Sequence, residues 1–262
     1  MSSGDDDLLK TLHRRADVLG LLIDEPRTKG ALIDELGISR STVDRALREL
    51  ETYNCVTRED EEFVVTAVGR VLYETYETHY AHVDAVGAAT EVLVNIPPSA
   101  PLSPAMMADA TVLRPDSPTP HTTYRKLENM INRSKRFRGI SIADTHFRFP
   151  SLLRDRTVGN DVPIELLATP AMADHLRENF TDAMYEAMTD GRLSLYQRED
   201  LPYGMLLSDH QDGASVAITV YGPRSDLSGI ILNDAPEAVI WARLVYRSFR
   251  RDATPVDPPS LE

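Results

Sequence analysis

One stretch, GISRSTVDRALREL at residues 37–50, most constrains what this chain can fold into. It begins with a glycine turn and continues with the pattern of an amphipathic helix. Apolar residues at positions i, i+3, i+4 and i+7 give that helix one core-facing side, made of Val43, Ala46, Leu47 and Leu50. The opposite side carries three arginines together with serine and aspartate. The stretch therefore predicts a helix that packs on a core and turns a strongly polar face outward.

The segments around this helix complete an order of elements. Residues 8–23 read as a helix, and Thr28 can cap a second helix through KGALIDELG. Ser39 is placed to cap the helix of the opening stretch. Residues 56–58 and 63–66 then predict two short strands about an acidic turn. Helix, helix, turn, helix and two-stranded wing is the order of a winged helix-turn-helix, which we expect over residues 5–66.

A single helical pattern follows the wing and covers residues 67–94. Apolar and aromatic residues recur along one side of it, at Val68, Leu72, Tyr76, Tyr80 and Val83. This stripe is either the core face of the helix or the seam of a dimer, and the two-fold symmetry of DNA operators favours the seam. Seven prolines then fall between Pro97 and Pro120, which no continuous helix accommodates. Residues 95–120 are therefore interpreted as a joint between domains.

Strands and helices alternate over residues 121–252. A helix is expected over residues 121–137 and a strand directly after it, over residues 138–144. The last strands form a meander, and residues 235–251 close the pattern with an amphipathic helix. This region predicts an α/β domain, so that the fold class of the whole chain is α+β.

The composition also indicates the cellular environment of the protein. The net charge is −13, and only four of the 28 basic residues are lysines, which is typical of proteins from salt-loving archaea. No apolar run approaches the ~20 residues of a membrane span, and the acidic N-terminus lacks the order of a signal peptide. We expect a cytoplasmic protein without a membrane partner. A single cysteine, Cys55, excludes a multi-cysteine zinc site, and no cofactor or metal is predicted.

Two sets of segments resemble known regulators. The segment from Pro26 to Leu72, PRTKGALIDELGISRSTVDRALRELETYNCVTREDEEFVVTAVGRVL, resembles the N-terminal winged helix of archaeal transcription regulators. PHTTYRKLENM, RFRGIS, GRLSLYQREDLPYGMLLSD and NDAPEAVIWARLVYRSFR resemble the C-terminal domain of regulators of the methanogenesis regulatory protein type. Together these resemblances cover roughly residues 5 to 255. They imply a dimeric DNA-binding regulator whose C-terminal domain, residues 121–252, senses an effector.

The resemblance also bears on catalysis. Those sensing domains are similar to a phospholipase-D-like fold that has lost its activity. The active enzymes need an H-x-K-x(4)-D motif, in which the histidine is the nucleophile and the lysine contacts the phosphate. Here the nearest match is His146-Phe147-Arg148, with Leu153 in the place of the aspartate. We therefore expect a binding protein and not an enzyme.

The polar face of residues 39–48 is interpreted as the DNA-reading surface, since the second helix of this motif enters the major groove. Its arginines can form paired hydrogen bonds with guanine or phosphate, and its hydroxyl groups can donate to phosphates near the helix N-terminus. Asp44 could accept from a cytosine amine. Lys29 and Arg58, at the base of the wing, complete the predicted contacts with double-stranded DNA: Lys29, Ser39, Arg40, Ser41, Thr42, Arg45, Arg48 and Arg58.

The negative charge of the N-terminal region argues against DNA binding. Acidic residues outnumber basic ones over residues 1–80, whereas released counterions normally favour basic DNA-binding domains. The wing tip is Glu59-Asp60-Glu61-Glu62, which puts the usual wing contact in doubt. In a salt-rich cell, counterion release adds little to DNA-binding affinity. An acidic domain can therefore still bind DNA there. The alternative function is a sensor or interaction module whose winged helix binds a protein partner.

Two further features of the C-terminal region each allow two interpretations. The basic run NRSKRFRG, residues 132–139, is interpreted first as a solvated helix end, where cations suit the helix dipole, and second as an anion or nucleic-acid contact. Asp144, His146 and Arg148 follow a predicted strand, where α/β folds place ligand pockets. They are candidate contacts for a small-molecule effector, and structural hydrogen bonding by the histidine is the competing interpretation.

Overall fold

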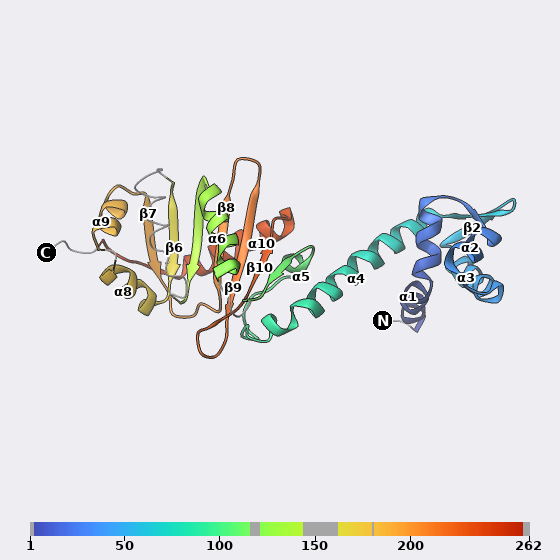
Figure 1. Cartoon of the computed structure of the whole chain (residues 1–262), viewed down its shortest axis with the longest axis horizontal. Coiled ribbons are helices and arrows are strands. Elements are labelled where there is room, and N and C mark those ends of the chain that lie inside the picture. The colour runs from blue at the N-terminus through green and yellow to red at the C-terminus, as the bar shows by residue number, and fades with distance from the viewer. Residues whose placement is uncertain (1–2, 116–120, 144–161, 180, 259–262) are drawn as a thin grey trace. The chain divides into compact units, whose positions relative to one another are not determined.

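The computed structural model describes residues 3–115, 121–143, 162–179 and 181–258 of the chain. They fall into two compact units, Met1–Ala81 and His82–Glu262. Helix α4 (Ala67–Leu93) contributes residues to both units, and Figure 1 labels the elements of each. Helices combine with a small antiparallel sheet and a large mixed sheet, which confirms the α+β class.

The first unit begins with helices α1 (Ser3–Asp24), α2 (Lys29–Leu36) and α3 (Arg40–Thr52). Strands β2 (Val56–Glu59) and β3 (Glu62–Val65) form an antiparallel hairpin, and the short strand β1 (Arg27–Thr28) pairs with the outer edge of β3. The predicted succession of helix, helix, turn, helix and hairpin is therefore present.

Local chemistry fixes the ends of these helices. The Thr28 hydroxyl accepts a hydrogen bond from the Ala31 amide at 3.3 Å and caps α2. Gly37 ends that helix with a left-handed φ of 64°, which glycine adopts at no steric cost. Two residues later, the Ser39 hydroxyl caps α3 by accepting from the Thr42 amide at 3.2 Å. The predicted apolar side of α3 then lies in one buried cluster with Leu19, Leu22 and Leu32.

The second unit is built on an eight-stranded sheet of order β11-β7-β6-β5-β8-β9-β10-β4. The strands are β4 (Thr111–Leu113), β5 (Arg136–Ser141), β6 (Ile164–Ala168), β7 (Leu193–Gln197), β8 (Gly204–Asp209), β9 (Ala214–Tyr221), β10 (Leu227–Asn233) and β11 (Thr254–Pro255). Parallel pairing joins β5, β6 and β7, while β8, β9 and β10 form the predicted antiparallel meander.

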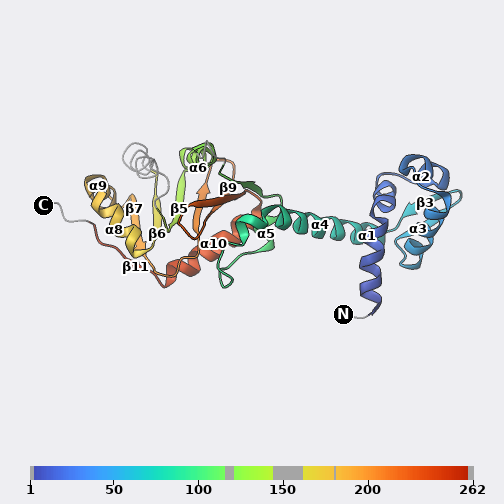
Figure 2. The same ribbon diagram turned by 60° about the horizontal axis from the view of Figure 1, so that its bottom comes forward.

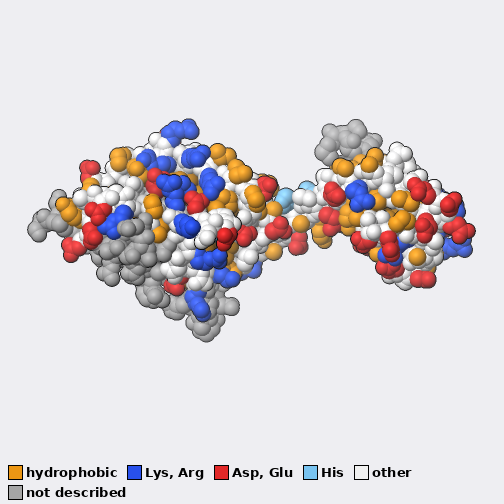
Figure 3. Space-filling model, turned by 90° about the horizontal axis from the view of Figure 1, so that it is seen from above, with side chains coloured by type: hydrophobic (Ala, Val, Ile, Leu, Met, Phe, Trp, Pro, Cys, Tyr) orange, Lys and Arg blue, Asp and Glu red, His pale blue; other side chains and the backbone are white. Residues whose placement is uncertain are grey.

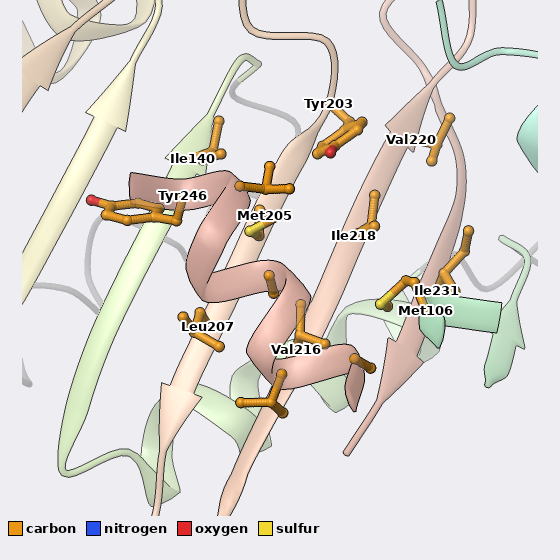
Figure 4. Packing of buried hydrophobic residues seen from close by; sticks show 14 of the residues in the cluster. Met106, Ile140, Tyr203, Met205, Leu207, Val216, Ile218, Val220, Ile231 and Tyr246 are labelled. Carbon is orange, nitrogen blue, oxygen red and sulfur yellow. The ribbon is translucent and has the colours of Figure 1, made fainter. Parts of the chain in front are cut away.

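Helices cover both faces of this sheet. Helices α6 (His121–Arg133), α8 (Pro170–Asn179) and α9 (Thr181–Thr189) pack on one face, and α5 (Pro104–Met107) and α10 (Pro236–Arg251) pack on the other. Figure 2 shows α6 and α10 on opposite sides of the sheet. Strand side chains alternate between the faces, so that Val216, Ile218 and Val220 of β9 belong to the core on the face that carries α10 (Figure 4).

Two segments differ from expectation. The proline-rich residues 95–120 contribute α5 and β4 to the second unit, and Met106 and Met107 are buried in its core. Pro104 occupies the first turn of α5, where its missing amide hydrogen costs nothing. The helix predicted over residues 121–137 ends at Arg133, and this prediction was wrong at its C-terminal end because Phe137 is a buried residue of β5. The basic run is thus divided between a helix end and a strand.

Candidate nucleic-acid interface

Helix α3 separates its residues into two faces. Val43, Ala46, Leu47 and Leu50 are buried, whereas Ser39, Arg40, Ser41, Arg45 and Arg48 are exposed to solvent. Thr42 is half-buried beside the N-cap. The structure thus places six of the eight predicted DNA contacts on one helix and its cap, while Lys29 and Arg58 come from neighbouring elements.

The hydroxyl groups at the start of α3 form a local network. Besides capping the helix, the Ser39 hydroxyl lies 2.9 Å from the Ser41 hydroxyl and 2.8 Å from that of Thr42. Ser39 is therefore largely engaged within the protein. The network fixes the Ser41 and Thr42 side chains at the helix N-terminus, where unpaired backbone amides attract anions.

The three arginines of α3 differ in their engagement. The Arg48 guanidinium donates from Nε to the Asp44 backbone carbonyl at 3.1 Å. Within the described part of the chain, the side chains of Arg40 and Arg45 form no hydrogen bond or ion pair. Their guanidinium groups are consequently free to bind an anion or a base edge from outside.

Lys29 is not free in the same sense. Its ammonium group donates to the Asp44 carboxylate at 2.6 Å, so that α2 and α3 are joined by an ion pair. This hydrogen bond from Lys29 holds the pKa of the Asp44 carboxyl below its ordinary value, and the charges of Arg40 and Arg48 add to the effect. Asp44 thus neutralises Lys29, which the sequence analysis had predicted as a DNA contact, and this pairing could not be read from the spacing of the two residues.

The Lys29–Asp44 pair leads to a testable expectation. In Asp44→Asn, Lys29 loses its carboxylate partner, and the exposed face of α3 loses its negative charge. Affinity for non-specific duplex DNA should rise, and the slope of log K against log salt should steepen by about 0.9 if Lys29 then reaches a phosphate. Fluorescence anisotropy over a salt series measures both quantities.

Asp34→Asn is the matched control, since Asp34 is exposed on α2 and makes the same change in net charge. Equal responses of the two variants would mean that only overall charge matters. A selective loss of affinity for one sequence in Asp44→Asn would instead indicate that Asp44 reads a base.

The hairpin that follows α3 is acidic at its tip. The residues from Glu59 to Glu62 are all exposed, and Asp60 adopts a left-handed φ of 53° at the turn. Arg58 donates from Nε to the Asp60 backbone carbonyl at 2.9 Å, and its side chain is exposed. Arg58 therefore stabilises the turn of the hairpin through this hydrogen bond.

The apolar stripe of α4 falls into two groups. Leu72 and Tyr76 are half-buried against the core of the first unit, and the Tyr76 hydroxyl lies 3.0 Å from Nδ1 of His13. Val68, Tyr80 and Val83 are exposed, with 49%, 53% and 56% of their surface accessible. Leu72 and Tyr76 thus belong to the core face of the helix, whereas for Val68, Tyr80 and Val83 the dimer seam stays a prediction.

The candidate effector contacts Asp144, His146 and Arg148 lie outside the residues that the structure describes. Among the described residues, no group of histidine, cysteine or acidic side chains is arranged to hold a metal ion. None of the helices in the described part is both long and apolar enough to cross a membrane.

Comparison with known families decides where the chain belongs. The family model for the middle domain of the methanogenesis regulatory protein FilR1 matches residues 120–252, half of the chain. The chain belongs to this family. The FilR1-type region begins beside α6 and ends just after α10, so it covers most of the second unit. A second model, for the HVO_A0261 N-terminal domain, matches residues 4–87 and hence the whole set of elements from α1 to β3.

Solved structures give more distant similarities. TrmBL2, described as an archaeal chromatin protein, is 15% identical, with 96% of this chain and 99% of that chain covered at a TM-score of 0.43. A phosphatidylserine synthase from Haemophilus influenzae Rd KW20 is 12% identical, with coverages of 83% and 54% and a TM-score of 0.38. An O-methyltransferase family protein from Burkholderia thailandensis is 15% identical, with coverages of 76% and 65% and a TM-score of 0.26. The curated proteins contain no significant match.

Proposed function

We propose that this protein is a sequence-specific, DNA-binding transcription regulator whose first unit is a winged helix-turn-helix. The observation that carries the proposal is the exposed face of α3, where Arg40 and Arg45 extend unpaired from a helix that follows α2 and the Gly37 turn. In this motif the second helix lies in the major groove, with its N-terminal residues against base edges. Membership in the family of a regulatory protein supports the same role.

Each predicted contact has a role in this proposal. Arg40 and Arg45 form paired hydrogen bonds with guanine or with phosphate. Arg48 contributes its terminal nitrogens. A phosphate accepts hydrogen bonds from the backbone amides at the start of α3 and from the hydroxyl groups of Ser39, Ser41 and Thr42. Arg58 reaches the backbone from the hairpin, and Lys29 acts mainly by neutralising Asp44.

The acidic surface is compatible with this function in a halophilic, archaeal cell. Concentrated salt reduces the screening distance to ~3 Å at 1 M, so acidic residues at the hairpin tip repel phosphates only at short range. Direct contacts by a few arginines then count for more than the net charge of −13. Recognition by α3 does not require a basic domain under these conditions.

We also propose that the protein is a homodimer, with the exposed residues of α4 as its seam. Val68, Tyr80 and Val83 are accessible, and Val86 on the same helix is 42% exposed. Large apolar side chains repeated along an exposed helix are costly in water unless a second surface covers them. A second copy of the same helix does so symmetrically and provides two α3 helices for a two-fold operator.

Val83→Asp tests the seam. The buried charge should prevent association, so that light scattering in molar KCl gives the mass of two chains for the unmodified protein and of one for the variant. Ala81→Asp is the control, because Ala81 is exposed on the other side of α4. An unmodified protein with the mass of one chain, or a Val83→Asp variant that stays dimeric, would contradict the proposal.

The second unit is proposed to be the regulatory domain, of the non-catalytic phospholipase-D-like kind. The parallel strands β5, β6 and β7 with their helices support an α/β framework, and the catalytic motif is missing from the sequence. We propose a DNA-reading domain over residues 5–66, a linking helix over 67–94 and a regulatory domain over 121–252, to which the predicted joint over 95–120 adds α5 and β4.

The acidic hairpin favours one alternative, in which the first unit binds a protein and not DNA. Selection of random duplexes on the full chain in molar KCl separates the two functions. Enrichment of a two-fold symmetric sequence, followed by an electrophoretic shift with that sequence, is the expected result. A failure to enrich any sequence, in low as well as high salt, would overturn DNA recognition and leave the protein-partner function.

A further inference from the structure

A recess of about 1090 Å³ opens at one end of the large sheet, entirely within the second unit. Helix α6 and the turn between β8 and β9 line it, together with the end of β10 and the first half of α10. It lies where β5 begins, since Asp209 in the recess pairs with Arg136, the first residue of that strand. The predicted effector contacts Asp144, His146 and Arg148 instead follow the other end of β5 in the sequence.

The wall formed by α6 is cationic. Lys126, Asn129 and Arg133 are spaced at i, i+3 and i+7, so they share one side of the helix, and all three line the recess. Lys126 and Arg133 are exposed and, within the described residues, have no carboxylate partner. Two uncompensated cations on the wall of a recess are unusual in a chain with a net charge of −13.

Fixed hydroxyl and imidazole groups lie beside this wall. The Ser208 hydroxyl hydrogen-bonds with the Ser134 hydroxyl, donates to the Met130 backbone carbonyl at 3.2 Å, and so joins β8 to the end of α6. His210 lies between two serines, with Nδ1 at 3.2 Å from the Ser208 hydroxyl and Nε2 at 2.7 Å from the Ser215 hydroxyl. Because a hydroxyl can donate or accept, this arrangement presents His210 and Ser215 to the recess in a set orientation.

Two arginines contact Asp209, the last residue of β8. Asp209 accepts from Arg243 of α10 at 2.6 Å and from Arg138 of β5 at 3.3 Å, while Arg136 stands opposite Asp209 in the sheet. Asp209 is thus paired with arginines from α10 and β5, so it is not the partner of Lys126 or Arg133 on α6. Figure 3 shows Lys and Arg side chains gathered on the face of the second unit that it draws, whereas Asp and Glu dominate that face of the first unit.

We propose that this recess binds a small anionic molecule that carries carboxylate or phosphate groups. Lys126 and Arg133 bind its charge from α6, and Asn129 and Ser215 donate hydrogen bonds from the same face of the sheet. The volume of about 1090 Å³ is slightly above the ~300–1,000 Å³ of typical ligand pockets. A regulatory role for this ligand rests on the proposed function above, but the binding itself does not.

The rim of the recess favours a small ligand over a nucleic acid. Asp109, Asp212 and Asp234 line the recess and are exposed. A long polyanion would bring several phosphates against these carboxylates, whereas a compact anion contacts fewer charged groups at once. The recess is therefore assigned to a small molecule and not to a second stretch of DNA.

Titration calorimetry on the full chain tests the assignment, with inorganic pyrophosphate and citrate as probes and glucose as an uncharged comparison. The ionic strength is kept constant with KCl. We expect saturable binding of pyrophosphate or citrate and none of glucose. The double variant Lys126→Gln/Arg133→Gln should bind the same probe at least ten-fold more weakly. Arg125→Gln, at an exposed α6 residue that does not line the recess, should bind it unchanged.

Three outcomes would overturn the inference: no saturable binding of either anion, equal weakening in Arg125→Gln, or unchanged binding in the double variant. Each of these proteins is also tested for binding to the duplex DNA enriched by the selection described above. A double variant that loses DNA affinity while the unmodified chain binds neither anion would identify a nucleic-acid surface and also overturn it. Failure of the unmodified chain to bind DNA, with anion binding intact, would refute the proposed function and leave the recess assignment standing.

Discussion

Replacing Arg40 and Arg45 together with alanine is expected to lower the affinity for specific duplex DNA by about 2–6 kcal/mol. A good paired contact from arginine to a base is worth ~1–3 kcal/mol, and separate contacts add approximately. Neither side chain forms a hydrogen bond or ion pair within the described part of the chain. The substitutions should therefore leave the free energy of unfolding almost unchanged.

Anisotropy titrations with the selected duplex and with a scrambled duplex measure this effect. Specific affinity should fall by far more than non-specific affinity, since base contacts carry sequence information and phosphate contacts do not. Arg70→Ala is the control for lost charge, because Arg70 is exposed on α4 and is not one of the predicted DNA contacts. If Arg70→Ala weakens specific binding as much as the double substitution of Arg40 and Arg45 does, the major-groove assignment of α3 is wrong.

Two glycines of α4 should respond in opposite ways to the same substitution. A Cβ atom at Gly69 would lie 2.0 Å from the Cys55 backbone carbonyl oxygen, a distance that real atoms do not reach. That carbonyl also accepts from the Thr66 amide at 3.0 Å, which holds it in place. Gly69→Ala must displace the start of α4 from the hairpin, and we expect a loss of about 3 kcal/mol in stability, at the upper end for overpacking.

Gly87→Ala provides the matched comparison. A Cβ atom at Gly87 meets nothing within 4 Å, and the backbone there is ordinary helix. Alanine should stabilise the helix by ~0.8–1.0 kcal/mol, the difference in helix propensity. Urea unfolding followed by circular dichroism measures both variants. A stable Gly69→Ala protein would show that the contact between α4 and Cys55 is not held as the structure describes.

The sequence by itself determined the local elements of the first unit. The 3.6-residue period of α3 separated Val43 and Leu47 from Arg45, and the cap residues Thr28 and Ser39 marked the helix starts. These signals are readable because capping and amphipathicity depend on neighbours within one or two turns. The meander of β8, β9 and β10 was predictable for the same reason, since short apolar runs between turn residues favour adjacent antiparallel strands.

Tertiary structure alone decided which side chains meet. The ion pair between Lys29 and Asp44 joins residues on different helices, and the crowding at Gly69 depends on the path of the chain at Cys55. The two groups of stripe residues on α4 differ only because the first unit covers Leu72 and Tyr76 and leaves Val83 exposed.

The recess follows the same rule. Arg133 belonged to a basic run that looked like a solvated helix end, and only the sheet brings it to the same cavity as His210 and Arg243. Strand pairing places Arg136 opposite Asp209 across 73 positions of sequence, a separation at which local periodicity carries no information. Local rules thus set the helices, strands and faces of this protein, whereas its ion pairs, close contacts and cavity arise from long-range packing.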